Sequence, residues 1–363
     1  MSPVLKNIIM ATLESSLLKS KFRACLLGSS IGDCFGSPYE GDIITSGEKI
    51  IIQRYFDKLE DPNFKGPYKQ YTDDTAMMKS VAKFLIDKPE PDYKFLAKLF
   101  VTEYFKDPKR GYGQNVVEVF HKLKNSKFDD IFKPANEQFL GSGSYGNGGA
   151  MRVAPIALYF YNKYNYMLEV ATNATKITHT NILGINGALL QCIAISQALL
   201  CDPETKIDPK VFCNQLCDKM KEIEKVDEDD LDATQNAYQE KLKIVENLLE
   251  KKHDDKLDEE VILHLGHGIS AYESVPTAIY CFLKAQNEIP TIDTGNAFRR
   301  TIQYAITLGG DTDTIACMAG ALAGAYLGEE AINPILAKQC ELNKEILELA
   351  DNLFSAREGL PIE

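Results

Sequence analysis

The chain has 363 residues with 45% hydrophobic side chains, enough to form a substantial core in one large domain or two ordinary ones. Its net charge of −12 argues against binding to nucleic acid through clustered Lys and Arg, so we expect no direct nucleic-acid partner. The nine Cys residues form no CxxC pair, which indicates buried thiols in a reducing compartment: nucleus, cytoplasm or mitochondrial matrix.

The first twenty residues precede the periodic pattern of the domain. They carry Lys6, Glu14 and Lys19 but no Arg and no small-residue cleavage site, which argues against a secretory signal. We interpret residues 1–20 as an N-terminal extension. From residue 21 to 363, apolar residues recur at three- and four-residue spacing, and no long Gly, Pro or Ser linker interrupts them. This pattern predicts one compact all-α domain of about a dozen helices.

Two segments near opposite ends of the domain carry glycines at four-residue spacing. They are Gly28, Gly32 and Gly36, and Gly320, Gly324 and Gly328. Glycine inside a helix costs about 1 kcal/mol relative to alanine, so such a series needs a compensating reason. Close approach of two helices supplies one. If the two helices lie antiparallel, Glu40, which follows the first series, meets Asp311, which precedes the second.

The next notable segment is TDDT, residues 72–75, where two carboxylates stand between two hydroxyls. Such a segment is typical of an ordinary helix N-terminus, because Thr caps helices and acids favour the first turn. The alternative is a set of oxygen ligands for a cation.

The segment FLGSGSYGNGGAMR, residues 139–152, is rich in glycine around Ser144, Tyr145 and Asn147. Glycines allow successive backbone N–H groups to point at one anion, and a helix starting near Gly149 would add its positive end. A phosphate-binding loop and a plain irregular loop fit this composition equally well. Phe139 and Tyr145 are candidates for stacking on a nucleobase, or for ordinary packing.

Two later segments have simpler interpretations. Residues 182–201 form the most apolar stretch, but Asn186 and Gln191 within it favour a buried core helix over a membrane span, so we expect no membrane association. Residues 219–260 are rich in charge, which predicts a solvated helical hairpin.

GGDTDT, residues 309–314, repeats the combination of carboxylate and hydroxyl seen in TDDT. Together with Glu40, the two motifs supply five carboxylates, which would repel one another in one pocket unless they were protonated or matched by cations. About two divalent ions would nearly balance them. Neither motif contains a Cys or His that would favour zinc or copper, so we expect the bound ion to be Mg²⁺, with Mn²⁺ as a substitute.

Several blocks of this sequence resemble the ADP-ribosylglycohydrolase family, whose members resemble dinitrogenase-reductase-activating glycohydrolase. The blocks are TDDTAM, GSYGNGGAMR, THTNILGINGA, ESVPTAIYCFL and GGDTDTIACMAGALAGAYLG. Among the types in this family, they look most like the serine-specific type that also degrades poly(ADP-ribose). The resemblance runs from about Phe22 to near the C-terminus and is weakest between Pro203 and Glu260. It implies an all-α fold with a binuclear magnesium cleft.

The resemblance also implies roles for individual residues. One magnesium would be held by Thr72, Asp73, Asp74 and Asp313, and the other by Asp311, Asp313 and Thr314. Glu40 matches a mobile glutamate that approaches the metals when the site is empty. The residues matching substrate contacts are Phe139, Gly143, Ser144, Tyr145, Gly146, Asn147, His179 and Ile269. Glu40, Asp73 and Asp74 are the predicted catalytic residues: Glu40 for proton transfer and the two aspartates for positioning the nucleophile.

The implied reaction is magnesium-dependent hydrolysis of the O-glycosidic bond of ADP-ribosylated serine, of poly(ADP-ribose) and of O-acetyl-ADP-ribose. Two alternatives remain open: an arginine-ADP-ribose hydrolase of the same fold, and a non-enzymatic relative like the crystallins with this fold. The expected partners are ADP-ribosylated proteins, such as serine-modified histones, and poly(ADP-ribose). We expect the protein to act as a monomer.

Overall fold

Helices account for the regular structure of the described chain. The computed structural model describes all residues except 1–2, 225–235, 253–254 and 360–363, with no side-chain description for 3–13 and 255. The elements run in the order α1 Pro3–Gly36, η1 Ser37–Tyr39, α2 Ser46–Leu59, α3 Asp73–Asp87, α4 Tyr93–Lys106, α5 Gln114–Asn125, α6 Lys133–Asn136, η2 Gln138–Gly141, η3 Asn147–Arg152, α7 Ala154–Tyr159, α8 Tyr164–Lys176, α9 Ile182–Leu200, α10 Pro209–Ile223, α11 Ala237–Leu249, α12 Asp255–His264, α13 Ala271–Lys284, α14 Ala297–Thr307, α15 Thr312–Leu327, η4 Glu329–Ala331, α16 Pro334–Ala337 and α17 Asn343–Glu358.

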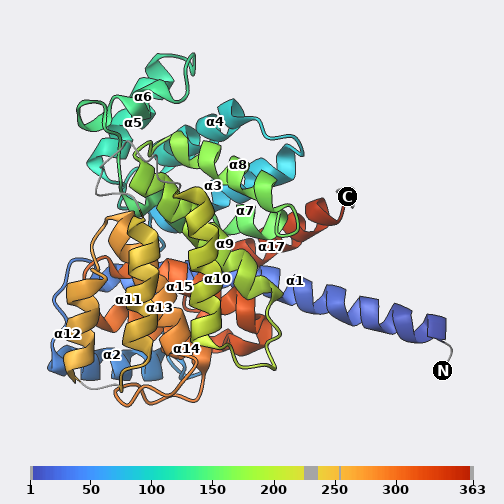
Figure 1. Ribbon diagram of the computed structural model, residues 1–363, viewed down its shortest axis with the longest axis vertical. Helices are drawn as coiled ribbons and strands as arrows, with labels where there is room; N and C mark the ends of the chain where they lie inside the picture. The colour runs from blue at the N-terminus through green and yellow to red at the C-terminus, as the bar shows by residue number, and fades with distance from the viewer. Residues whose placement is uncertain (1–2, 225–235, 253–254, 360–363) are drawn as a thin grey trace.

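The prediction of a single all-α domain is confirmed. Within the described ranges there are 17 α-helices and no strand, only two isolated bridges. The number exceeds the dozen expected partly because very short helices such as α6 and α16, with four residues each, carry no periodic pattern long enough to detect. In Figure 1, α4, α5, α6 and α8 lie at one end of the molecule and α2, α12 and α14 at the other.

Helices α1 and α15 pack antiparallel through their glycines, as predicted. A Cβ added at Gly28 would collide with the carbonyl of Gly320, and one added at Gly324 would collide with the carbonyl of Ala24. Gly32 contacts the backbone of Ala316 in the same way. The antiparallel register brings the C-terminal end of α1 to the start of α15, where Glu40 and Asp311 follow and precede the paired helices.

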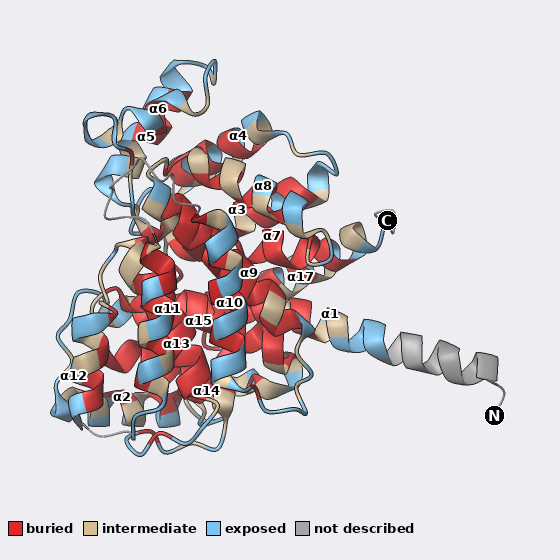
Figure 2. Cartoon of the chain, in the orientation of Figure 1, coloured by how far each residue is buried: buried red, intermediate tan, exposed pale blue. Residues whose placement is uncertain are grey.

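The core surrounds α15. Helices α9, α13, α14 and α15 are largely buried, whereas the outer faces of α10, α11 and α12 are exposed (Figure 2). Helix α9 has the length and hydropathy of a membrane span, but 83% of its apolar window is buried inside the domain. Its N-cap Asn181 accepts a hydrogen bond from the backbone N–H of Leu183. The prediction of a core helix over this segment is therefore confirmed.

Two predictions, the boundary after residue 20 and the charged segment 219–260, concern parts of the chain next to residues that the structure does not describe. The boundary after residue 20 lies inside α1, where residues 14–17 are exposed and Phe22 is buried; the division into extension and domain stays a prediction. The charged segment contains the end of α10, all of α11 and the first part of α12, and α10 packs against α11. Its most acidic part, within 225–235, lies outside the described residues.

Candidate active site

The turn before α15 holds the Glu40 segment in place. Gly309 and Gly310 both have φ of 73°, a backbone conformation that favours glycine. The N–H of Gly41 donates to the carbonyl of Gly310 at 2.8 Å, and the N–H of Gly310 donates to the carbonyl of Asp42 at 3.2 Å. These main-chain bonds place Glu40 directly beside Asp311.

All five predicted carboxylates gather at this point. Single carboxylate oxygens of Glu40, Asp311 and Asp313 lie within 4.8 Å of one another. The start of α3 joins them, because the hydroxyl of Thr314 donates to Oδ2 of Asp74 at 3.4 Å. Asp73 and Asp74 line the same cavity as the other three acids. The helix starts at 72–75 and 311–314, separated by more than 230 residues, thus build one cluster.

A sixth carboxylate, Asp33, was missed by the sequence analysis. It is fully buried on α1 and accepts hydrogen bonds from the N–H of Thr72 at 2.9 Å, from the N–H of Thr75 at 3.0 Å and from the Thr75 hydroxyl. It therefore holds the first turn of α3, where Asp73 and Asp74 begin the helix. No flanking hydroxyl or repeated motif marks Asp33 in the sequence. Its role becomes visible only from the contact between α1 and α3.

Burial and mutual repulsion shift the pKa values of these acids upward. Burial first, and then Asp33, raise the pKa of Asp73 to about 8. Burial raises the pKa of Asp33 itself to about 6, against hydrogen bonds from Thr75 and Thr72 that lower it. The pKa values of Asp74 and Asp313 lie well above the usual range because of burial and neighbouring carboxylates. Burial and then Asp311 raise the pKa of Glu40.

The cluster fits a hard divalent cation. Among the described residues, none of its carboxylates forms a salt bridge with Lys, Arg or His. Oδ1 of Asp74 is buried without a hydrogen-bond partner in the described chain. Such an oxygen costs folding free energy unless a ligand such as a cation binds it. Oxygen-only donors suit Mg²⁺ or Mn²⁺ and not zinc. This donor set can bind metal.

The glycine-rich loop forms another part of the cavity lining. The N–H of Asn147 donates to the carbonyl of Ile269 at 3.0 Å, and the N–H of Ala271 donates to the carbonyl of Tyr145 at 3.0 Å. The amide of Asn147 also reaches Oδ2 of Asp311. The loop is thereby tied both to the segment before α13 and to the acid cluster. The helix predicted near Gly149 is a 3-10 helix, η3, which begins at Asn147. The next α-helix, α7, begins at Ala154.

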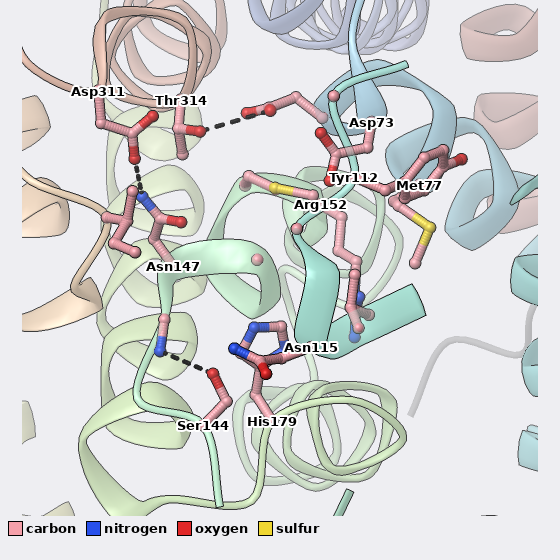
Figure 3. A pocket seen from close by; sticks show the side chains of 18 of the residues that line it. Asp73, Met77, Tyr112, Asn115, Ser144, Asn147, Arg152, His179, Asp311 and Thr314 are labelled. Atoms are coloured by element: carbon pink, nitrogen blue, oxygen red, sulfur yellow. Dashed lines mark hydrogen bonds between the residues drawn. The ribbon is translucent and has the colours of Figure 1, made fainter. Parts of the chain in front are cut away.

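One cavity of about 330 Å³ connects the acids with the loop. In Figure 3, Asp73, Asp311 and Thr314 lie in the upper part of the view, Ser144 and His179 lie in the lower part, and Asn147 lies between the two groups. The cavity is lined by most of the predicted site residues, namely Glu40, Asp73, Asp74, Phe139, Ser144, Tyr145, Gly146, Asn147, His179, Ile269, Asp311, Asp313 and Thr314. Two predicted residues do not line it. Thr72 caps α3 beside Asp74, and Gly143 lies against Thr180 and Asn181.

The outer part of the lining is apolar and exposed. The rings of Phe139 and Tyr145 are stacked, with centroids 6.4 Å apart and planes at 28°. Ile269 is 71% exposed. Phe139 and Leu140 have φ of 51° and 59°, which is uncommon for residues other than glycine and costs conformational energy. The stacked rings of Phe139 and Tyr145 offer a flat apolar surface to a planar ligand.

Several lining residues were not predicted. They are Met77, Gly111, Tyr112, Gly113, Asn115, Val116, Gln138, Gly148, Met151 and Arg152. The segment 111–116 reaches the cavity because the N–H of Asp73 donates to the carbonyl of Arg110 at 2.6 Å. Arg110 is itself held by Glu341 through both of its terminal nitrogens, at 2.8 and 2.9 Å. The short glycine-rich string GYGQN was the available signal for this segment.

Comparison with known proteins identifies the family. The family model "ADP-ribosylglycohydrolase" matches residues 14–361. The chain is 43% identical over 345 residues to ADP-ribosylhydrolase ARH3 of Mus musculus, covering 92% of this chain and 91% of that protein. It is 42% identical to ADP-ribosylhydrolase ARH3 of Homo sapiens, with 92% and 93% covered. A solved structure described as an "ADP-ribosylglycohydrolase-related protein complex" matches with a TM-score of 0.65 at 19% identity, over 94% of this chain and 99% of that chain, and supports the fold. This chain therefore belongs to the ADP-ribosylglycohydrolase family and is a glycohydrolase enzyme.

Proposed function

We propose that this enzyme is a magnesium-dependent hydrolase that releases ADP-ribose from ADP-ribosylated serine, from poly(ADP-ribose) and from O-acetyl-ADP-ribose. The observation that carries the proposal is a cavity in which five carboxylates face a glycine-rich loop and an aromatic pair. ADP-ribose has matching parts: a ribose diol for a cation site, a diphosphate for backbone N–H groups and an adenine for the aromatic rings.

The carboxylate cluster suits two magnesium ions. Thr72, Asp73, Asp74 and Asp313 are proposed to hold one ion, and Asp311, Asp313 and Thr314 the other, with Mn²⁺ as a substitute. Two observations support this assignment: Oδ1 of Asp74 is buried without a hydrogen-bond partner, and none of the acids forms a salt bridge within the described part of the chain. When bound, magnesium supplies electrostatic stabilisation of the ribose oxygens and lowers the pKa of a water ligand.

The loop residues are proposed to bind the nucleotide. Gly143, Ser144, Tyr145, Gly146 and Asn147 surround the diphosphate and ribose, while Phe139 and Ile269 contact the adenine side. Gly148 in the same loop must stay small, because a Cβ there would lie 2.7 Å from Cε1 of His179. Burial first and then Arg152 lower the pKa of His179 to about 3, so its imidazole is neutral. A neutral imidazole still carries one N–H, which can donate to an anionic oxygen of the nucleotide.

Bond cleavage passes through an oxocarbenium-like state, with a proton delivered to the leaving oxygen and water attacking the opposite face of the ribose. Glu40 is proposed to transfer the proton. It lies at the cavity edge, and burial together with Asp311 raises its pKa, which favours a carboxyl group that can give up a proton. Asp73 and Asp74, which line the same cavity, are proposed to position the attacking water.

The proposed partners follow from this chemistry. They are ADP-ribosylated proteins such as serine-modified histones, together with poly(ADP-ribose), bound by the terminal unit. We propose no direct binding of this protein to nucleic acid or to membranes. We propose a monomer in the nucleus and cytoplasm, with the mitochondrial matrix as a further location.

The decisive experiment measures ADP-ribose release from two matched peptides, one modified on serine and one on arginine, each with magnesium and with excess chelator. Release from the serine peptide alone, abolished by chelation, is the expected result. Release from the arginine peptide would overturn the serine assignment while keeping the cleft. Unchanged release under chelation would overturn the magnesium assignment.

A further inference from the structure

Three residues form a chain of hydrogen bonds from the core to the cavity. Arg152, at the end of η3, is 2% exposed, and its guanidinium lies 4.4 Å from the centroid of the Phe100 ring. One of its terminal nitrogens donates to the carbonyl of Ala174 at 3.0 Å and to Oγ1 of Thr178 at 2.7 Å. Oγ1 of Thr178 lies 2.7 Å from Nδ1 of His179. No step of the proposed reaction uses Arg152 or Thr178.

The direction of each bond follows from the chemistry of the donors. A guanidinium can only donate, so Oγ1 of Thr178 accepts from Arg152. The single hydroxyl proton of Thr178 then has one acceptor among the described contacts, which is Nδ1 of His179. A neutral imidazole carries one proton, so Nδ1 is the bare nitrogen and Nε2 carries the hydrogen.

The protonated nitrogen lies at the glycine-rich loop. A Cβ added at Gly148 would lie 3.0 Å from Nε2 of His179, and one added at Gly146 would lie 3.4 Å from it. His179 and Gly146 line the cavity together with Ser144. The backbone around the histidine is also fixed, because the amide of Gln138 donates to the carbonyl of Thr178 at 2.7 Å.

We propose that Thr178, oriented by Arg152, is a positioning residue that fixes His179 in the tautomer with hydrogen on Nε2, and thereby makes His179 a permanent neutral donor to an oxygen of the bound nucleotide. The second half rests on the proposed function, because it takes ADP-ribose as the ligand. The first half does not depend on any ligand. A wrong tautomer would point a lone pair at the anion and leave the Thr178 proton without an acceptor.

The tautomer can be measured directly in the ligand-free protein. The chain has five His, so a long-range ¹H–¹⁵N spectrum of protein labelled with ¹⁵N-histidine is simple to assign, using His179→Gln to identify the His179 signals. The expected pattern for His179 is a protonated Nε2 and a bare Nδ1. The opposite pattern in the wild-type protein would overturn the proposal without any Thr178 variant.

Two variants of Thr178 separate the hydroxyl from the shape of the side chain. In Thr178→Val we expect the tautomers to mix and the Kd for ADP-ribose to rise about tenfold, the loss of roughly one hydrogen bond in a buried site. Thr178→Ser should restore both the tautomer and the Kd. Thr301→Val is the matched control, because Thr301 is also buried and its hydroxyl donates to the carbonyl of Ala297 within α14, far from His179 in the sequence.

The outcomes distinguish the two claims. A wild-type tautomer and Kd in Thr178→Val, or failure of Thr178→Ser to restore them, would overturn the positioning role. If the wild-type protein shows the expected tautomer but does not bind ADP-ribose, the proposed function fails while the role of Thr178 stands.

Discussion

Replacing Gly32 by alanine should destabilise the protein although it removes a glycine from a helix. The atoms closest to a Cβ at Gly32 are the carbonyl oxygen and carbon of Ala316 and the nitrogen of Cys317, all of them backbone atoms of α15. No rotamer change can relieve such a collision, so α1 and α15 must move apart. Overpacking of this kind costs about 1–3 kcal/mol, and a backbone collision belongs at the upper end.

The gain in helix propensity, about 1 kcal/mol, offsets part of this cost. We therefore expect a net loss of about 2 kcal/mol in the free energy of unfolding, measured by urea denaturation with chelator and with magnesium. Gly47→Ala is the matched control. Gly47 also lies in a helix, α2, but the nearest atom to its added Cβ is Oγ1 of Thr45 at 3.8 Å. This variant should be stabilised by about 0.4–1 kcal/mol. Equal or greater stability of Gly32→Ala, or an equal loss in both variants, would refute the close packing of the two helices.

Three further predictions concern the carboxylates. Glu40→Gln should lower kcat about 100-fold or more with little change in the Kd for ADP-ribose, and an unchanged kcat would remove Glu40 from proton transfer. Asp33→Asn should weaken magnesium binding about tenfold in calorimetry, because an amide cannot accept from Thr72 and Thr75 as the carboxylate does; wild-type affinity would contradict its role in holding α3. The chelated protein should lose stability as pH rises from about 5 to 8. Burial raises the pKa of Asp33 to about 6 and that of Asp73 to about 8 from a usual 3.8, so the folded state keeps protons that the unfolded chain has released. Saturating magnesium should remove this loss, and a chelated protein whose Tm is constant over that range would disprove the raised pKa values.

The local patterns predicted most of the fold and much of the candidate site. The glycine spacing predicted that α1 and α15 pair, and it also placed Glu40 beside Asp311, because a four-residue repeat reports directly on one face of a helix. The hydroxyl and carboxylate motifs marked two helix starts that share one cluster.

The unpredicted residues owe their places to tertiary contacts. Asp33 stands in an ordinary helical sequence, and its importance comes from two amides of another helix that point at it. Arg152 was visible inside a conspicuous motif, but only the structure shows that it turns away from the loop toward Thr178. Helices α6 and α16 are too short for periodicity to reveal.

Main-chain hydrogen bonds join the segments around the cavity: the N–H groups of Ala271, Asp311 and Gly41 donate to the carbonyls of Tyr145, His267 and Gly310, respectively. Because these bonds use peptide groups, substitutions of the side chains at Phe139, Tyr145 or Ile269 leave them in place. Ligand preference can therefore be changed at the exposed part of the lining while the acid cluster stays assembled. For inhibitor design, the same division separates a constant polar end from an adjustable apolar end, and selectivity between related enzymes should be sought at the latter.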